Sequence, residues 1–320
     1  MGRLVSSLTV LILVLGSPVA TAQEGTEPAP TAVHDLSAVA EGSAVSVAAH
    51  VAFGGQAPVV LGTDPTGDAP PNGTGHGAGA GLDLTEIRAY QADPAVPRVT
   101  FEWQATALDQ LPPPEVVRYY WQFTVGAAVF AVQAKTTDIV SAANAGDGEP
   151  ETIANNLASY AGSSVPSFRV RGNCALIELV VTGLNNCGHV AWVAGEFDVA
   201  ADVIRLHLPL DLAAAPTLRP GAIIAPEDTG AYSAIQAAAD FGQTRDTVVQ
   251  ASPYAVPKPR ATATLVAADG TLVDTGQLSL DDDGMWRGTL TAPAAGSYRV
   301  DLDACFATNC GVAQTAVAVG

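Results

Sequence analysis

Short stretches in which apolar and polar residues alternate recur along this chain, and they constrain its fold more than any other feature. One of these stretches, 117–125, places its apolar residues on one face: Val117, Tyr119, Trp121, Phe123 and Val125. The stretch Val99–Trp103 repeats the pattern, with Val99, Phe101 and Trp103 facing inward. Alternation with a period of two is typical of a β-strand that buries one face. The chain is therefore expected to be built mainly of strands.

Turn residues separate these stretches, and Gly126-Ala127-Ala128 predicts a hairpin between 117–125 and 129–134. Further strands are predicted at 43–53, 59–61, 82–90, 168–171, 176–181, 190–193 and 203–208. Only Ala231–Asp240 favours a helix, and it is short. Many short strands with turns between them predict an all-β fold made of β-sandwiches.

Two β-sandwich domains are expected, because a mature chain of about 300 residues exceeds what one sandwich needs. Pro253, Pro257 and Pro259 mark a linker at 253–259. The larger sandwich is placed at 41–252, after a flexible lead-in at 23–40. The short strands within 260–320, with a turn at Asp281–Gly284, predict a small immunoglobulin-like domain.

The N-terminus has the features of a secretion signal. Arg3 precedes the apolar run Leu8–Leu15, and Ala20-Thr21-Ala22 supplies the small residues of a cleavage site. Residues 1–22 are therefore predicted to be a signal peptide. A secreted, extracellular protein that is not inserted in a membrane in its mature form is expected; the alternative is a retained membrane anchor.

The net charge restricts the classes of ligand, and the cysteines indicate the cellular compartment. The net charge of −18, from 32 acidic against 14 basic residues, argues against nucleic acid as a ligand. Four cysteines suit an oxidising compartment, and their spacing favours the pairs Cys174–Cys187 and Cys305–Cys310. The alternative for the first pair is a metal site that uses Cys187 and His189.

No motif for nucleophilic or metal-dependent hydrolysis is present: the sequence lacks Gly-x-Ser-x-Gly, His-Glu-x-x-His and a P-loop. Glu102 and Glu178 are the carboxylates considered for a glycoside hydrolase, against the alternative that they are solvated strand residues. Tyr120 lies on the opposite strand face from Trp121, which makes it the candidate for a platform on which a sugar ring stacks.

An acidic, glycine-rich segment at 62–83 is the candidate metal site. Asp64, Asp68 and Asp83 offer three carboxylates together with backbone carbonyls, the oxygen ligands that Ca²⁺ prefers. The expectation is a Ca²⁺ site formed by these three residues. The alternative is an acidic loop in water.

The same region carries a family resemblance. Asp64-Pro65-Thr66-Gly67-Asp68, then Asp83-Leu84 and the strand ending at Trp103, resemble the glucodextranase-type β-sandwich module, which is related to family 9-like carbohydrate-binding and DOMON-like modules. The tail from Ala304 to Gly311 resembles the end strand of small bacterial immunoglobulin-like domains. The first resemblance, over about 59–135, implies a secreted module that binds carbohydrate in some members and often holds calcium.

Three functions follow as hypotheses. The first is a non-catalytic binding or surface protein whose partner is a polysaccharide or a cell-surface component. The second is a secreted glycoside hydrolase. The third is a structural protein of the envelope or of an appendage.

Overall fold

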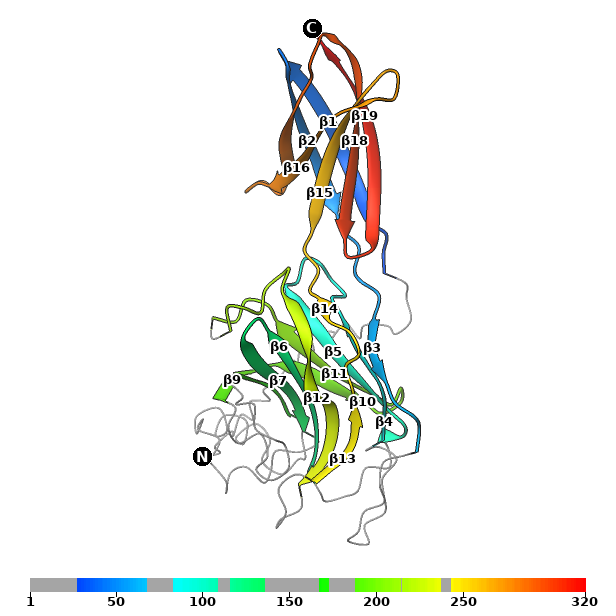
Figure 1. The fold of residues 1–320 in the computed structure, drawn as a ribbon, viewed down its shortest axis with the longest axis vertical. Coiled ribbons are helices and arrows are strands. Elements are labelled where there is room, and N and C mark those ends of the chain that lie inside the picture. The colour runs from blue at the N-terminus through cyan, green and yellow to red at the C-terminus, as the bar shows by residue number, and fades with distance from the viewer. Residues whose placement is uncertain are drawn as a thin grey trace, which may run out of the picture.

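The computed structural model describes residues 28–67, 83–108, 116–135, 167–172, 188–213, 215–236 and 243–320. These residues form strands and turns, and the described part of the chain contains no helix. Two lobes lie end to end, with the C-terminus at the far tip of the smaller lobe (Figure 1). The all-β prediction is therefore confirmed.

The smaller lobe, called here the immunoglobulin-like lobe, combines both ends of the described chain. Its strands are β1 (Ala32–Glu41), β2 (Ala44–Ala52), β15 (Arg260–Ala267), β16 (Leu272–Leu280), β17 (Trp286–Thr291), β18 (Gly296–Phe306) and β19 (Asn309–Val319). They follow the order β1-β2-β17-β16-β15-β18-β19. Strand β16 pairs with β15 over most of its length and with β17 through its last two residues.

This strand order is that of an immunoglobulin sandwich. Lettered A to G in chain order, the strands form one hydrogen-bonded path, A-B-E-D-C-F-G, which contains the A-B-E and C-F-G neighbours of that fold. Both halves of this strand path contribute to one core of small and branched side chains, among them Val47 from β2, Leu265 from β15 and Val300 from β18. The all-β prediction is confirmed for this lobe, and its A-B-E and C-F-G neighbours are those expected of the predicted immunoglobulin-like domain.

The larger lobe is inserted between β2 and β15, the second and third strands of the immunoglobulin-like lobe. Its strands are β3 (Val59–Thr63), β4 (Leu84–Tyr90), β5 (Arg98–Ala105), β6 (Val116–Val125), β7 (Ala128–Lys135), β8 (Ser167–Gly172), β9 (Gly188–Trp192), β10 (Ala194–Asp198), β11 (Val203–Pro209), β12 (Ile223–Gln236), β13 (Gln243–Val248) and β14 (Tyr254–Ala255). One sheet has the order β10-β11-β5-β4-β3. The other has the order β13-β12-β6-β7-β8-β9, with β14 beside β12.

Aromatic rings from β5 and β6 fill the space between these sheets. Phe101 packs edge-on against Trp121 with ring centroids 4.8 Å apart, and it stacks on Phe123 at 5.2 Å. Trp103 and Tyr119 are also fully buried. The inward faces predicted from alternation at 99–103 and for Tyr119, Trp121, Phe123 and Val125 are thus confirmed, as is the hairpin, whose turn places Gly126 at a φ of 60°.

The placement of residues 32–52 corrects the predicted division of the chain. Residues 32–40 are not a flexible lead-in, because they form most of β1, and β2 does not belong to the larger sandwich. Strand β2 pairs with β17 instead, with Val47 opposite Gly288. Alternation identifies a strand and its buried face, but it does not identify a partner that is distant in the sequence. The immunoglobulin-like lobe is therefore discontinuous, not confined to 260–320.

The predicted helix at 231–240 is also wrong. Residues up to Gln236 continue β12, which pairs with β6 on one side and β13 on the other. Ala231 lies opposite Trp121 and is fully buried. Ala231, the first of the alanines that favour a helix, is small enough to fit into the aromatic core, and pairing with two strands overrides local propensity. Residues 237–240 lie outside the described part.

Candidate functional site

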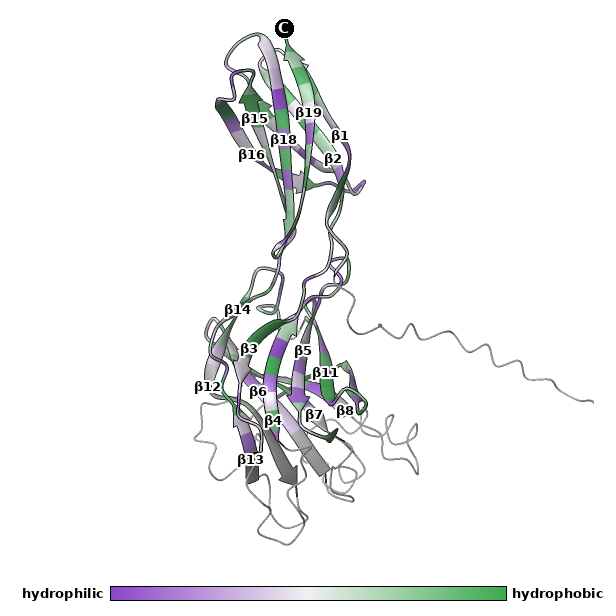
Figure 2. Cartoon of the chain, turned by 90° about the vertical axis from the view of Figure 1, so that its right-hand side faces the viewer, coloured by the Kyte–Doolittle hydropathy of each residue, from purple (hydrophilic) through white to green (hydrophobic). Residues whose placement is uncertain are grey.

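A charged network crosses the outer face of the sheet β10-β11-β5-β4-β3. Strand register places Glu196, Arg205, Glu102 and Arg88 in one row across four adjacent strands. The inward neighbours of these residues, such as Phe101 and Leu206, are in the core, so alternation turns the row outward. Figure 2 shows hydrophilic segments along β4, β5 and β11.

Glu102 lies at the centre of the network and both of its carboxylate oxygens are engaged. Arg88 Nη1 donates to Oε1 at 2.7 Å, and Arg205 Nε donates to Oε2 at 2.9 Å. Arg205 Nη1 also reaches Glu196 at 2.9 Å and Asp198 at 3.3 Å. The side chain of Glu102 is 5% exposed and that of Glu196 is 54% exposed. The network therefore runs from a buried centre to an open rim.

Tyr90, Thr100 and His207 form the next row of the same face. The Tyr90 hydroxyl lies 3.4 Å from Glu102 Oε2, and Thr100 Oγ1 shares a 3.0 Å hydrogen bond with His207 Nδ1. Burial, followed by the negative charge of Glu102, raises the pKa of Tyr90 to about 12. Burial, followed by the charge of Arg98, lowers the pKa of His207. Both side chains are therefore neutral at pH 7.

The geometry of this face suits hydrogen-bonded recognition. Glu102 is held between two guanidinium groups, which leaves it badly placed to reach a glycosidic oxygen as a proton donor. The half-exposed Arg88 and Tyr90 and the exposed Glu196 offer donors, acceptors and a ring to a polar ligand. The partners of Glu102 were missed in the sequence, although Arg88 and Arg205 occupy the polar positions of alternating strands. Glu178 lies outside the described residues.

Tyr120 does not provide an open stacking surface. It lies on the face opposite Trp121, as predicted, but it is only 4% exposed. Gln133 Nε2 donates to its hydroxyl at 2.8 Å, and Arg169 Nε donates in turn to Gln133 Oε1. The Arg169 guanidinium lies 5.8 Å from the Trp192 ring centroid. A polar residue on the outer face of a sheet is thus not necessarily exposed, which alternation alone does not reveal.

Asp83 is the acidic residue of the 62–83 segment that the structure places most firmly. Its side chain is 3% exposed, and Oδ2 accepts hydrogen bonds from Gly67 N at 2.8 Å and from Thr106 Oγ1. Its Oδ1 is buried with no hydrogen-bond partner. Asp64 lies nearby, since its backbone N–H donates to Thr85 O at 2.9 Å. Asp68 lies outside the described residues.

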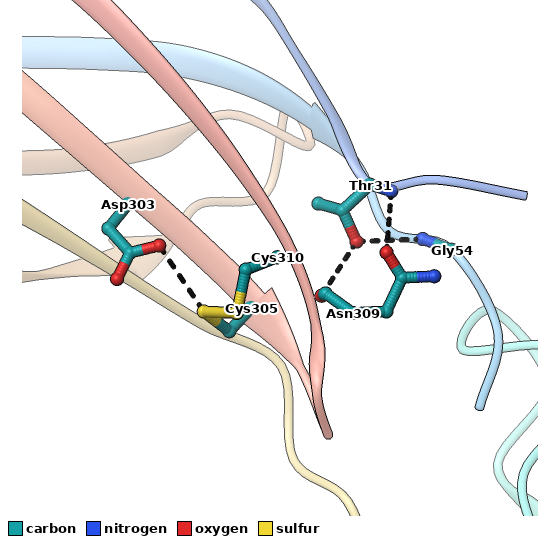
Figure 3. Close-up of a disulfide and its surroundings, with 6 residues drawn as sticks. All are labelled: Thr31, Gly54, Asp303, Cys305, Asn309 and Cys310. Atoms are coloured by element: carbon teal, nitrogen blue, oxygen red, sulfur yellow. Dashed lines mark hydrogen bonds between the residues drawn. A yellow bond between two sulfur atoms is a disulfide. The ribbon is translucent and has the colours of Figure 1, made fainter. Parts of the chain in front are cut away.

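The predicted disulfide Cys305–Cys310 is present, joining residues that lie opposite each other on β18 and β19. Asp303 Oδ1 lies 3.3 Å from Cys305 Sγ (Figure 3). A disulfide sulfur carries no hydrogen, so this is a close contact and not a donated hydrogen bond. Asp303 and the two sulfurs are the only cluster of three His, Cys, Asp or Glu side chains within metal-binding distance of one another in the described ranges, and the bonded cysteines offer no thiolate. Cys174 and Cys187 lie outside those ranges.

Comparisons with protein-family models, with curated proteins and with solved structures found no match to this chain. No helix among the described residues is long and apolar enough to span a membrane.

Proposed function

We propose that this chain is an exported, non-catalytic binding protein in which the immunoglobulin-like lobe carries the larger lobe as its ligand-binding part. The observation that carries the proposal is the network around Glu102, a connected set of charged and aromatic residues on one outer face of the inserted sandwich. Buried charges are costly unless they are fully paired, and such networks hold the groups that they contact in one geometry.

The ligand class that best fits this face is a polysaccharide. Sugar hydroxyls both donate and accept hydrogen bonds, so a surface with guanidinium, carboxylate and phenol groups side by side complements them. Tyr90 adds a half-exposed ring against which a sugar can pack. The larger lobe is anchored to the immunoglobulin-like lobe through two chain crossings, one before β3 and one after β14.

A bound divalent cation at Asp83 is a second part of the proposal. A carboxylate that is 3% exposed with an unpartnered oxygen is expensive to leave uncompensated, and no Lys or Arg among the described residues pairs with it. Ca²⁺ would supply the missing charge and accept further oxygens from the neighbouring segment, which includes Asp64 and, from the sequence, Asp68.

A glycan array probed with the mature protein tests the binding role. Binding to a defined class of polysaccharide, reduced in Arg88→Ala and Tyr90→Ala but retained in Arg299→Ala, is the expected result. Arg299 is the matched control because it pairs with Asp301 on the immunoglobulin-like lobe. Hydrolysis of a chromogenic glycoside that Glu102→Gln abolishes would favour an enzyme instead. No binding on the array and no hydrolysis of the glycoside would favour a structural role.

Thermal melting in millimolar calcium and in chelator tests the cation. A cation that binds only the folded state raises its melting temperature by mass action. The melting temperature of the wild-type larger lobe should be higher in calcium than in chelator. Asp83→Asn should lose most of this difference, whatever its own starting stability. Asp301→Asn is the control and should respond as the wild type does. An equal melting temperature in calcium and chelator would contradict the proposed site.

A further inference from the structure

The joint between the lobes consists of two chain segments, residues 53–58 and 256–259, which run side by side between the lobes (Figure 1). The first leads from β2 to β3 and the second from β14 to β15. Linkers of this length ordinarily allow relative motion of the parts that they join. Whether this joint moves depends on what holds these segments.

Asn309, the first residue of β19, uses its whole carboxamide to hold this joint. Its Oδ1 accepts a hydrogen bond from Thr31 N at 2.8 Å, and its Nδ2 donates to Ala29 O at 2.8 Å and to Gly55 O at 3.1 Å. One side chain thus binds the segment that precedes β1 and the segment that leads into the larger lobe. A carboxamide offers two donor hydrogens and one acceptor oxygen, and all three are used.

Thr31 completes the set of contacts around Asn309, as Figure 3 shows. The Thr31 hydroxyl donates to Asn309 O at 2.9 Å and accepts from Gly54 N at 3.1 Å. Thr31 is 6% exposed, so these bonds are shielded from water. Shielded hydrogen bonds are more costly to break without replacement than exposed ones.

Two consecutive glycines fit the joint closely on both sides. A Cβ on Gly54 would lie 1.7 Å from Ala29 O, on the immunoglobulin-like side. A Cβ on Gly55 would lie 1.9 Å from Ala92 O, on the side of the larger lobe. Any other residue type would push the backbones apart. The next residue, Gln56, is tied to the larger lobe by Tyr254, whose hydroxyl donates to Gln56 Oε1 at 2.7 Å.

The disulfide holds Asn309 in position. Cys305 and Cys310 are paired across β18 and β19, and the next pair toward the turn is Phe306 with Asn309. The turn itself places Ala307 at a φ of 52°, a conformation that is unfavourable for a residue with a Cβ. Such a residue keeps this conformation only where its surroundings enforce it. The disulfide and the buried Phe306 supply that constraint.

We propose that Thr31, Gly54 and Asn309, held by the Cys305–Cys310 disulfide, form a clasp that fixes the larger lobe in one orientation relative to the immunoglobulin-like lobe. The clasp is a device for orientation, separate from the stability of the larger lobe, since two of its bonds join the immunoglobulin-like lobe to the segment that leads into the larger lobe. It is also independent of what the larger lobe binds. Loss of Asn309 donors or of the disulfide turns the joint into a hinge.

Single-molecule energy transfer across the joint tests the clasp. Dyes are attached to genetically encoded keto residues at Val39 and Val199, which are 60% and 49% exposed on the smaller and larger lobes, so that the cysteines stay untouched. The wild type should give one narrow distance distribution. Asn309→Asp keeps the side-chain shape but removes both donors and faces two carbonyls with a negative charge, so its distribution should broaden. Thr308→Ala, in the exposed turn beside it, is the control and should match the wild type.

The double variant Cys305→Ala with Cys310→Ala provides a second route, should Asn309→Asp fail to fold. It should also broaden the distribution, and proteolysis within 53–58 should accelerate roughly tenfold, because cleavage follows the population of the opened joint. Melting of the larger lobe should be unchanged in both variants. A narrow distribution and wild-type proteolysis in a folded variant would overturn the proposal.

Discussion

Both lobes are β-sandwiches, but they differ in how many polar side chains they bury. In the immunoglobulin-like lobe, Thr31 at the joint is the one buried polar side chain among the described residues. The larger lobe buries many more: Asp83, Gln91, Thr100, Glu102, Gln122, Gln133, Arg169, Asp246 and Gln250. Buried polar groups rarely improve stability over apolar ones of similar shape. Their concentration in one lobe supports our proposal that this lobe binds the ligand and that the other lobe carries it.

The cores of the two lobes also differ in the size of their side chains and in their polar contacts. The larger lobe packs Phe101 and Trp103 edge to face against Trp121, and the indole of Trp121 also donates to Gln250 Oε1 at 2.9 Å. The immunoglobulin-like lobe is filled by valine, alanine and leucine, with Trp286 near its edge against Phe53. Large rings that must also satisfy polar partners leave fewer alternative packings than small aliphatic side chains do.

The largest effect should come from separating the two pieces of the immunoglobulin-like lobe. Residues 256–320 alone should not fold, because they lack β1 and β2, which supply Val45, Val47 and Ala49 to the core. Residues 28–53 joined by a short glycine-serine loop to 256–320 should fold, because they contain the complete sandwich. Circular dichroism and calorimetry measure both. A cooperative melting transition in residues 256–320 alone would show that the lobe is not an interdependent unit.

Trp121→Ala should give the next largest effect and should separate the lobes. Removing a fully buried indole costs about 3–5 kcal/mol through lost burial and a residual cavity. It also leaves Gln250 without one of its partners. Calorimetry of the whole chain should show one transition lowered and the other unchanged. Trp286→Ala is the matched variant: it should lower the other transition, and by less, because that ring is at the edge of its core.

Glu102→Gln should lower the free energy of unfolding of the larger lobe by less, about 2–3 kcal/mol, because it removes the charge between two guanidinium groups but keeps the volume of the side chain. The value is below that of a fully buried pair because the side chain of Arg88 is 30% exposed. Chemical denaturation of the larger lobe measures it. Asp301→Asn, which disrupts an exposed pair on the other lobe, should leave stability unchanged. Equal effects of the two variants would mean that the network is not a structural centre.

The sequence predicts local features of both lobes well. Period-two alternation identified the buried faces of β5 and β6, and the spacing of Cys305 and Cys310 identified a disulfide within one hairpin. These features depend on neighbours in the sequence or on the pattern of one strand. The same reasoning called 231–240 a helix, because propensity does not register the two strands that flank β12.

What the sequence does not predict is pairing at a distance. Strand β2 is a strand by its pattern, yet only the structure places Val47 beside Gly288 and so reveals the insertion. The candidate site follows the same rule. The pattern of one strand is enough to identify Glu102 as a candidate. Its partners Arg88 and Arg205 can be identified only once the strand register, which places them on either side of Glu102, is known. The environment of Tyr120 likewise depends on β7 and β8.

The smallest expected effect concerns pH and one imidazole. The pKa of His207 is lowered, first because burial disfavours the charged ring and then because Arg98 and Arg205 oppose a third positive charge, with Glu196 acting in the other direction. Between about pH 6.5, where an unfolded histidine titrates, and the lower folded pKa, the unfolded chain therefore binds more protons than the folded one. Stability of the larger lobe should thus be fully present above pH 6.5 and should fall as the pH drops through this window.

His207→Gln keeps a partner for Thr100 Oγ1 but does not titrate. In calorimetry, the melting temperature of its larger lobe should therefore fall less between pH 7.5 and 5.5 than that of the wild type. The transition of the immunoglobulin-like lobe in the same scan is the internal control. An identical loss in wild type and variant would show that His207 does not contribute to the acid sensitivity of this face.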